Sequence, residues 1–227
     1  MNIIVTGASR GIGFELVKQF LNAGHTVFCL TRNLEPLKNI VHSNLKSIST
    51  DLTSQNSINN AVSFIKKEAT HIDCIVNNAG SLVNKPYESI LYDELQKVYQ
   101  VNVFAPYYLI QQLLPLLGKE QKSHVVNISS MGGFQGSAKF PGLTAYSSSK
   151  AAIAGLTECL AEELKDKNIS VNCLAIGAVQ TEMLAEAFPG YKAPLSPIQM
   201  AEYIFDFALK GHQYYNGKIL PVSSTTP

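Results

Sequence analysis

Short apolar runs alternate with segments of helical periodicity along all 227 residues. The apolar runs are bounded by glycine or polar residues and predict strands. They cover Met1–Val5, His25–Leu30, Lys46–Thr50, Ile72–Val76, His124–Ile128, Ile169–Leu174 and Lys218–Val222. Apolar positions at helical spacing predict helices over Phe14–Ala23, Leu34–Val41, Ser54–Glu68, Tyr92–Leu117, Tyr146–Lys165 and Ile198–Leu209. Residues 182–197 show no clear period and predict an irregular segment.

This alternation predicts an α/β fold, with a parallel sheet, helices on both of its faces and right-handed crossovers. No low-complexity linker or second period interrupts it, so residues 1–227 are expected to form a single domain. Pro106 and Pro115 fall within one long predicted helix and are expected to kink it or end it. In such sheets, ligands bind beyond the carboxyl ends of the strands.

A glycine-rich turn, Thr6 to Gly13, lies directly between the first predicted strand and helix. Gly7 can adopt backbone conformations that side chains forbid. Gly11 and Gly13 let the main chain approach a pyrophosphate and let the helix sit close to the strand. The helix N-terminus then offers free N–H groups to phosphates. This context predicts a dinucleotide site; an ordinary glycine-rich turn is the alternative.

Polar residues follow four more predicted strands. They are Arg32, Asp51, Asn78 and Ser130, which come after the second, third, fourth and fifth strands. Because the carboxyl ends of parallel strands share one edge, these residues and the glycine turn are expected to form one site.

Composition narrows the possible partners. Hydrophobic residues make up 46% of the chain and charged residues 15%, which permits a large core, and a net charge of +1 argues against nucleic-acid binding. No apolar run has the length of a membrane span, and no signal peptide precedes the first strand. The five histidines do not cluster and no C-x-x-C pair occurs, so no metal site is predicted. Three of the four cysteines lie in apolar runs, which suggests reduced thiols and a cytoplasmic setting.

The chain resembles the short-chain dehydrogenase/reductase family over essentially its whole length. The matching motifs stand in the family's order and at roughly its spacing. They are Thr6-Gly7-Ala8-Ser9-Arg10-Gly11-Ile12-Gly13, Asn77-Asn78-Ala79-Gly80, Asn102, Asn127-Ile128-Ser129-Ser130 and Tyr146-Ser147-Ser148-Ser149-Lys150. The resemblance implies a three-layer, Rossmann-like fold with a mostly parallel seven-stranded sheet. It also implies a nicotinamide cofactor and hydride transfer between a carbonyl and an alcohol.

The sequence departs from the family pattern at three places. Ile176-Gly177 stands where the family usually has Pro-Gly, and the family's glycine pair near the C-terminus is missing from the end, Pro221 to Pro227. Ser130 and Tyr146 are also a few residues further apart than the family leads one to expect, which implies a longer loop beside the site.

Tyr146 and Lys150 are four residues apart, so they share one face of a helix. A nearby ammonium group favours the phenolate and is expected to lower the tyrosine pKa; a solvated helix start is the alternative. By resemblance, Tyr146 is the acid/base, Lys150 also binds the ribose, Ser130 polarises the carbonyl and Asn102 belongs to a proton relay. Strand alternation puts only one of Ser129 and Ser130 into the cleft, and the family motif selects Ser130.

The end of the second strand indicates the cofactor. NAD-binding proteins usually carry an acidic residue there, whereas this chain has Thr31 and Arg32 and no carboxylate before Glu35. Arg10 and Arg32 could pair with a 2′-phosphate, which favours NADP(H) over NAD(H); alternatively, Arg32 is an ordinary surface residue.

The resemblance implies further cofactor contacts. Asp51 and Leu52 hold the adenine, Ala79 and Gly80 leave room for the cofactor, and Thr181 holds the nicotinamide carboxamide. It also assigns to this site Ser9, Ile12, Asn78, Gly177 and Val179.

Residues 182–197 lie where the family carries a substrate lid. Their apolar residues, which include Met183, Leu184 and Phe188, predict an uncharged or largely apolar carbonyl or alcohol substrate, unless they simply pack the loop onto the sheet. Small residues after Ala151 and the long helix from Tyr92 predict a homodimer or homotetramer, since family members pair through these two helices. Two other functions compete: a cofactor-binding sensor on the same fold, and an epimerase or dehydratase, for which the short C-terminal segment leaves little room.

Overall fold

The computed structural model describes residues 1–223; residues 224–227, which end the segment without the family's glycine pair, lie outside the described part. The chain forms seven strands within residues 1–223. These are β1 (Asn2–Thr6), β2 (Thr26–Thr31), β3 (Leu45–Ser49), β4 (Cys74–Asn77), β5 (Ser123–Ser130), β6 (Ile169–Ile176) and β7 (Ile219–Val222). All neighbouring strands pair in parallel, in the order β3-β2-β1-β4-β5-β6-β7. The order reverses between β1 and β4, which opens a crevice at their carboxyl ends.

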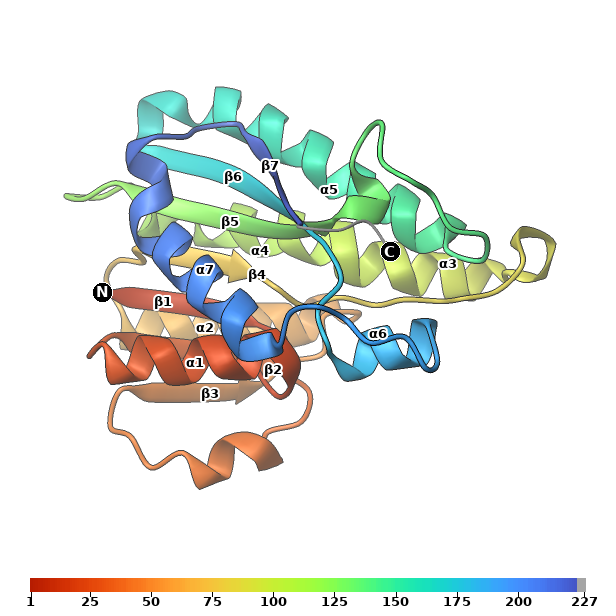
Figure 1. Ribbon diagram of the computed structural model, residues 1–227. Coiled ribbons are helices and arrows are strands. Elements are labelled where there is room, and N and C mark those ends of the chain that lie inside the picture. Colours follow the sequence, from red (N-terminus) through yellow and green to blue (C-terminus); the bar gives the residue numbers. More distant parts are fainter. Residues whose placement is uncertain (224–227) are drawn as a thin grey trace.

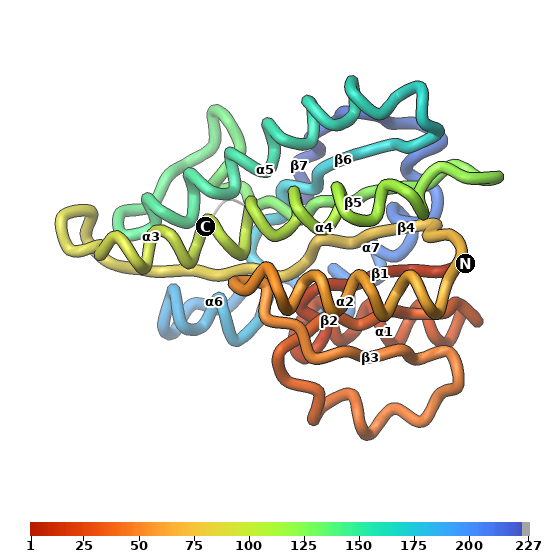
Figure 2. Tube along the Cα trace, turned by 180° about the vertical axis from the view of Figure 1, so that it is seen from behind, coloured from red at the N-terminus to blue at the C-terminus, as the bar shows by residue number. Residues whose placement is uncertain are grey.

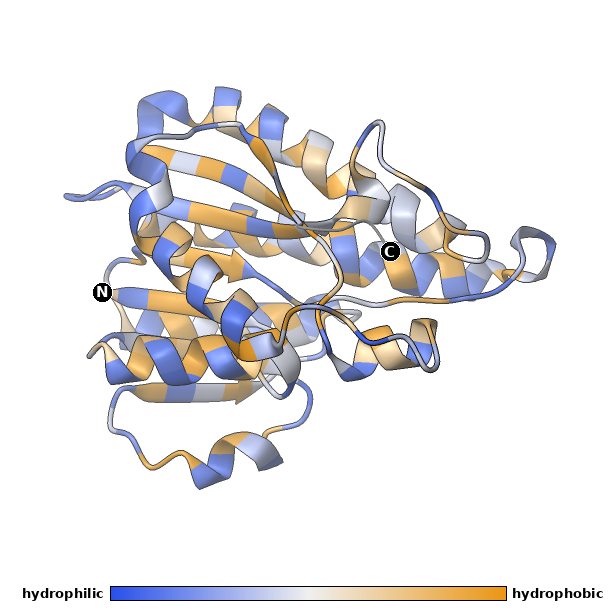
Figure 3. Ribbon diagram, in the orientation of Figure 1, coloured by the Kyte–Doolittle hydropathy of each residue, from blue (hydrophilic) through white to orange (hydrophobic). Residues whose placement is uncertain are grey.

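Helices cover both faces of this sheet, as predicted. Helices α1 (Gly11–Asn22) and α7 (Pro197–Lys210) pack together on one face (Figure 1). Helices α2 (Gln55–Glu68), α4 (Ala105–Leu113) and α5 (Thr144–Glu163) lie over the other face (Figure 2). Two apolar cores result, one on each side of the sheet, and the strands themselves are largely hydrophobic (Figure 3). The amphipathic pattern of α1 explains its orientation, because Leu16, Val17 and Phe20 are fully buried.

The predicted helix Tyr92–Leu117 is a continuous helical stretch, but it is not a regular α-helix throughout. It consists of α3 (Tyr92–Tyr99), a π-helical turn η3 (Gln100–Phe104), α4 and a 3-10 turn η4 (Leu114–Leu116). Pro106 follows the π turn and has no N–H to donate to the carbonyl of Asn102, four residues earlier. The irregularity therefore precedes Pro106, whereas Pro115 lies in the turn that ends the helix.

Two other predicted segments differ in the structure. The helix expected over Leu34–Val41 is only a 3-10 turn, η1 (Glu35–Asn39), and ends before the exposed Val41. The prediction that residues 182–197 are irregular is wrong at their start, because α6 (Glu182–Ala187) forms there. Thr181 caps this helix, since its Oγ1 accepts a hydrogen bond of 3.3 Å from the backbone N–H of Leu184. The remaining 3-10 turns are η2 (Tyr87–Ser89), η5 (Met131–Gly133), η6 (Lys165–Lys167) and η7 (Gly211–Gln213).

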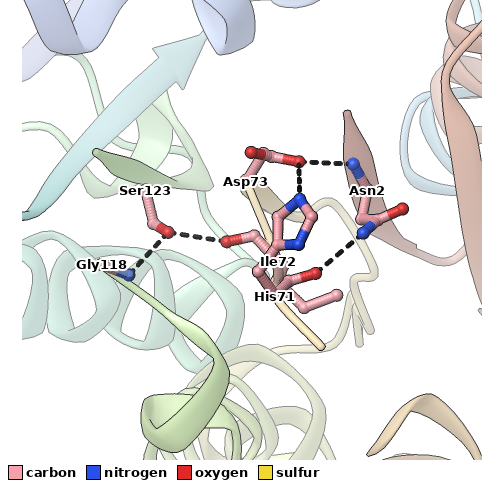
Figure 4. Close-up of polar contacts among 6 residues, drawn as sticks. All are labelled: Asn2, His71, Ile72, Asp73, Gly118 and Ser123. Carbon is pink, nitrogen blue, oxygen red and sulfur yellow. Dashed lines mark hydrogen bonds and ion pairs between the residues drawn. The ribbon is translucent and has the colours of Figure 1, made fainter. Parts of the chain in front are cut away.

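The amino-terminal edge of the sheet is tied by polar contacts of buried side chains (Figure 4). The Asp73 carboxylate accepts the backbone N–H of Asn2 at 2.6 Å, and His71 Nε2 lies 3.5 Å away. Ser123 Oγ donates to the carbonyl of Ile72 at 2.6 Å and accepts from the N–H of Gly118 at 2.8 Å. These bonds fix the starts of β1, β4 and β5 and leave the opposite edge for ligands.

Candidate active site

A cleft of about 680 Å³ opens at the carboxyl edge of the sheet, where the strand order reverses. This is within the ordinary size range of ligand sites, about 300–1,000 Å³. Every predicted cofactor-binding or catalytic residue lines it except Gly13 and Asn102. The polar clusters after the first five strands therefore line one cleft at the same edge of the sheet.

The glycine turn needs its glycines for two different reasons. Gly7 and Gly11 have φ values of +69° and +56°, which L side chains rarely adopt, and a Cβ on Gly7 would also lie 2.8 Å from the Cα of Ala79. Gly13 lies inside α1, where a Cβ would be 2.3 Å from the carbonyl oxygen of Gly7. Gly13 therefore allows close packing of the helix on the turn and does not face the cleft.

Asn78 braces this turn from the neighbouring strand. Its Nδ2 donates to the carbonyl oxygens of Thr6 at 3.0 Å and Gly7 at 3.3 Å. The N–H of Ala79 donates to Thr6 Oγ1 at 3.0 Å. The amide of Asn78 thus holds the ends of β1 and β4 together at the floor of the cleft.

The far end of the cleft carries the residues predicted to bind the adenosine half of a cofactor. Arg10 and Arg32 are exposed there, and Thr31 is buried at the end of β2. Asp51 Oδ1 accepts hydrogen bonds from the N–H and the hydroxyl of Thr53, at 2.9 and 2.8 Å, and chiefly the first of these lowers the pKa of Asp51. Lys97 of α3 also lines the cleft, although no motif in the sequence marks it.

Ser130, Tyr146 and Lys150 meet at the other end of the cleft. Lys150 is buried and its Nζ donates to the carbonyl oxygen of Ile128 at 2.7 Å. The same Nζ lies 5.8 Å from the centre of the Tyr146 ring. Burial lowers the pKa of Lys150 to about 8.

The pKa of Tyr146 differs from the expectation that Lys150 lowers it. Burial raises the pKa of Tyr146, and its hydrogen bond with Ser130 opposes that effect. Desolvation of the phenol is the larger of these two influences, whereas the ammonium group of Lys150 bonds the carbonyl oxygen of Ile128.

The two candidate serines have different surroundings. Ser129 Oγ is buried and donates to the carbonyl oxygen of Lys150 at 2.6 Å, which joins β5 to α5. Ser130 is half-buried, and its Oγ accepts from the N–H of Gly132 at 3.2 Å and bonds Tyr146. The hydroxyl beside Tyr146 is thus that of Ser130.

Asn102 lies behind the cleft, on the π turn, and is 2% exposed. Its side chain bonds both backbone groups of Ser81, at 2.8 and 2.9 Å, and its Nδ2 also donates to Ser149 Oγ at 2.8 Å. Ser149 Oγ in turn donates to the carbonyl oxygen of Tyr146 at 2.7 Å. Sequence reasoning missed Ser81 and Ser149; the apolar neighbours of Asn102 indicated only that its buried amide needs partners.

The segment predicted to be a lid, residues 182–197, borders the cleft through its first residues. Met183, Leu184, Ala187 and Phe188 line the cleft, but so do Glu182 and Glu186, so the inner surface is only partly apolar. Tyr191, also expected on this surface, does not line the cleft. The Phe188 ring packs edge-on against Phe140 of the long loop after Ser130, with ring centres 5.5 Å apart. By contrast, Leu195 pairs with Val179 and packs on the core of the α1 and α7 face.

Among residues 1–223, no group of three or more His, Cys, Asp or Glu side chains is arranged to hold a metal ion. No helix in the same range is both long enough and apolar enough to cross a membrane.

Comparisons with known proteins agree with this geometry. The 3-oxoacyl-[acyl-carrier-protein] reductase FabG of Aquifex aeolicus is 30% identical over 237 aligned positions, which cover 97% of this chain and 94% of the relative. A structure of RhlG of Pseudomonas aeruginosa in a complex with NADP matches with a TM-score of 0.86 and 30% identity, over 98% of this chain and 94% of that one. A 4-hydroxyisoleucine dehydrogenase complexed with NADH matches with a TM-score of 0.88 and 26% identity, over 98% and 96% of the two chains.

The sequence profile of the short chain dehydrogenase family matches residues 1–192. This range contains the glycine turn, the asparagine that braces it, the π turn and the serine, tyrosine and lysine at the end of the cleft. The chain therefore belongs to the short chain dehydrogenase family of oxidoreductases.

Proposed function

We propose that this protein is an NADP(H)-dependent carbonyl reductase that interconverts an apolar ketone or aldehyde and its alcohol. The observation that carries the proposal is the convergence of Ser130, Tyr146 and Lys150 in one cleft with the glycine turn, Arg10 and Arg32. A nicotinamide dinucleotide bound in this cleft would have its phosphates near the glycines and its reactive ring near the acid/base.

The residues present fit such a cofactor. Gly7 and Gly11 expose main chain at the N-terminus of α1, where free N–H groups and the helix dipole favour phosphates. Asp51 and Leu52 would hold the adenosine half of the cofactor, and Gly80, Thr181 and Tyr146, which line the same cleft, would hold its nicotinamide half. Similarity to proteins solved with NADH and with NADP supports a nicotinamide cofactor, and the two arginines with no acidic residue at the end of β2 favour NADP(H).

The bound cofactor supplies or accepts the hydride. The Ser130 hydroxyl donates a hydrogen bond to the carbonyl oxygen, and Tyr146 gives its proton to that oxygen as negative charge develops. The raised pKa of Tyr146 keeps the phenol protonated at neutral pH, which suits a proton donor in carbonyl reduction. Lys150 carries its charge below about pH 8 and stands beside the tyrosine ring, where it favours the phenolate left after proton transfer.

The side chains of the lid favour an apolar, uncharged substrate. Met183, Leu184 and Phe188 of the lid line the cleft and are apolar, so they would bind substrate by area buried from water, whereas Glu182 and Glu186 line the cleft beside the glycine turn. Among the cleft-lining residues in the described part of the chain, the arginines are Arg10 and Arg32, both at the cofactor end. At the other end of the cleft, where the substrate would bind, these residues therefore offer no guanidinium group to bind a substrate carboxylate in bidentate fashion.

A panel of carbonyl compounds, followed by the loss of NADPH or NADH absorbance, tests this function. We expect NADPH to be consumed with apolar ketones or aldehydes and NADH to be used less efficiently. Equal efficiency with both cofactors would contradict the assignment from Arg10 and Arg32, and a preference for small keto acids would contradict the substrate class. Tight NADPH binding without turnover of any compound would instead favour a cofactor-binding sensor.

A further inference from the structure

The lid helix α6 turns two carboxylates toward the glycine turn. Glu182 and Glu186 are four residues apart and so share one face of the helix. Glu186 Oε1 lies 3.6 Å from Nη1 of Arg10, the residue that precedes α1. Glu182 Oε2 lies 3.8 Å from the position that a Cβ on Gly11 would take. The acidic face of the lid thus covers the part of the cleft where cofactor phosphates are expected.

Arg10 cannot give the same donors to Glu186 and to a phosphate. Both partners of this ion pair are more than half exposed, at 55% and 66%, so the contact is weak and can be displaced. A phosphate dianion offers Arg10 a stronger, charge-assisted partner, and it repels the nearby carboxylate. The C-terminal end of α6 has separate attachments, because Asn84 Nδ2 donates to the carbonyl oxygen of Ala187 at 2.7 Å and Phe188 packs on Phe140.

We propose that Glu186 competes with the 2′-phosphate of NADP(H) for Arg10, and so determines both the affinity for NADP(H) and its preference over NAD(H). This inference rests on the proposed function, in which Arg10 binds that phosphate. Binding of NADP(H) breaks the contact between Glu186 and Arg10, while Asn84 and Phe140 still hold the adjoining residues Ala187 and Phe188. NAD(H) has no 2′-phosphate and leaves the Arg10–Glu186 pair in place.

Dissociation constants for NADPH and NADH, from titrations of cofactor fluorescence, test this in four proteins: wild type, Glu186→Gln, Arg10→Ser and the double variant. Glu162→Gln is the matched control, because Glu162 forms an exposed ion pair with Lys165 far from the cleft. We expect Glu186→Gln to lower the NADPH constant by about two- to fivefold, the range of an exposed ion pair. In the Arg10→Ser background, Glu186→Gln should change the NADPH constant by a smaller factor, because only the repulsion between carboxylate and phosphate is then relieved, and in wild type the NADH constant should change less than the NADPH constant.

Three results would overturn the inference. The NADPH constant of Glu186→Gln could equal those of wild type and Glu162→Gln, the change could persist undiminished in the Arg10→Ser background, or NADH binding could tighten as much as NADPH binding. Wild-type protein without preference for NADPH would refute the proposed cofactor instead. In that case, hydrogen exchange of the α6 amides, measured without cofactor, tests the Arg10–Glu186 contact independently of cofactor choice. Faster exchange in Glu186→Gln supports a lid held by Arg10, and unchanged exchange refutes it.

Discussion

Lys150 joins the helix of the candidate site to the sheet through both its side chain and its backbone. Its Nζ donates to the carbonyl oxygen of Ile128, and its own carbonyl oxygen accepts the Ser129 hydroxyl. A second tie lies deeper, where Asn127 Nδ2 donates to Thr157 Oγ1 at 2.9 Å. Because β5 and α5 are joined at several residues, the position of Tyr146 relative to Ser130 is set by the sheet itself.

His124 is a buried neutral histidine on β5, and its burial predicts how the stability of the protein depends on pH. Its Nδ1 bonds the carbonyl oxygen of Ala208 and its Nε2 bonds Asn172 Nδ2, each at 3.0 Å, so the donor on Nδ1 and the acceptor on Nε2 are both satisfied in the neutral ring. Burial lowers its pKa to about 4, whereas the unfolded chain takes up the proton near pH 6.5. Stability is therefore lost as pH falls from 6.5 toward 4, because the unfolded state binds the proton first.

We expect the contribution of His124 to the free energy of unfolding to fall by about 2 kcal/mol between pH 7 and pH 5. Urea denaturation of wild type and His124→Gln at both pH values measures it. The variant is less stable at pH 7 but should lose about 2 kcal/mol less on acidification. The same loss in both proteins would show that His124 is not the acid-sensitive group.

The sequence could predict which residues meet in the cleft, but not how their charges are used. The shared face of Tyr146 and Lys150 follows from helical periodicity, and the apolar neighbours of Asn102 indicate that it is buried. The direction of the Tyr146 pKa does not, because it depends on burial and on the backbone carbonyl to which Lys150 turns. The same holds for Arg10, which the sequence pairs with a phosphate and the structure pairs with Glu186.

At the scale of elements, α6 and the long loop before α5 together form the substrate end of the cleft. Phe188 of the lid meets Phe140 of the loop, and both line the cleft. The loop also bonds the segment after β4, where the N–H of Lys85 donates to the carbonyl oxygen of Gly142 at 3.0 Å. Three segments that are distant in sequence thus close one pocket.

Phe188→Ala should raise the KM for apolar carbonyl substrates by about tenfold, because an aromatic contact and its buried area are lost. The NADPH dissociation constant should stay within a few fold of wild type, since Phe188 lies at the opposite end of α6 from Thr181. Lys192→Ala is the control, because Lys192 is exposed and does not line the cleft. Steady-state kinetics measure both. An unchanged KM in Phe188→Ala would mean that the lid packs without touching substrate.

The helix in the lid could not be predicted because its six residues are too few for a period to show. Its start depends on the Thr181 cap, a role that the family motif does not suggest. The π turn at Gln100–Phe104 is similar, since Pro106 alone indicates a break but not its type or position. Elements with several turns, such as α2 and α7, follow the predicted spans within one or two residues.

At the scale of the molecule, the alternation of strands and helices predicted the parallel sheet and its two covered faces. The helices proposed to pair with a second copy keep apolar surface exposed: Phe104 and Tyr107 are 52% and 50% exposed. Ala151 is exposed on α5 and a Cβ on Gly155 would meet open space, although Ala154, expected on the same surface, is buried in the core. A second copy would cover this apolar surface.

We expect a dimer or tetramer at micromolar concentration, measured by light scattering. Phe104→Lys should shift the protein toward the monomer, because it puts a charge into the proposed contact. Val41→Lys, at a fully exposed position on another side, should not. A monomeric wild type would contradict pairing through these helices.

The most direct test of the account is the turnover of Tyr146→Phe with NADPH and the best carbonyl substrate of the wild type. Tyr146→Phe removes the proton donor and leaves the ring, so turnover should fall by about 100-fold or more while the NADPH dissociation constant stays within a few fold. Tyr214→Phe, which removes an exposed hydroxyl elsewhere, should turn over like wild type. Turnover of Tyr146→Phe within a few fold of wild type would contradict the claim that this tyrosine transfers the proton.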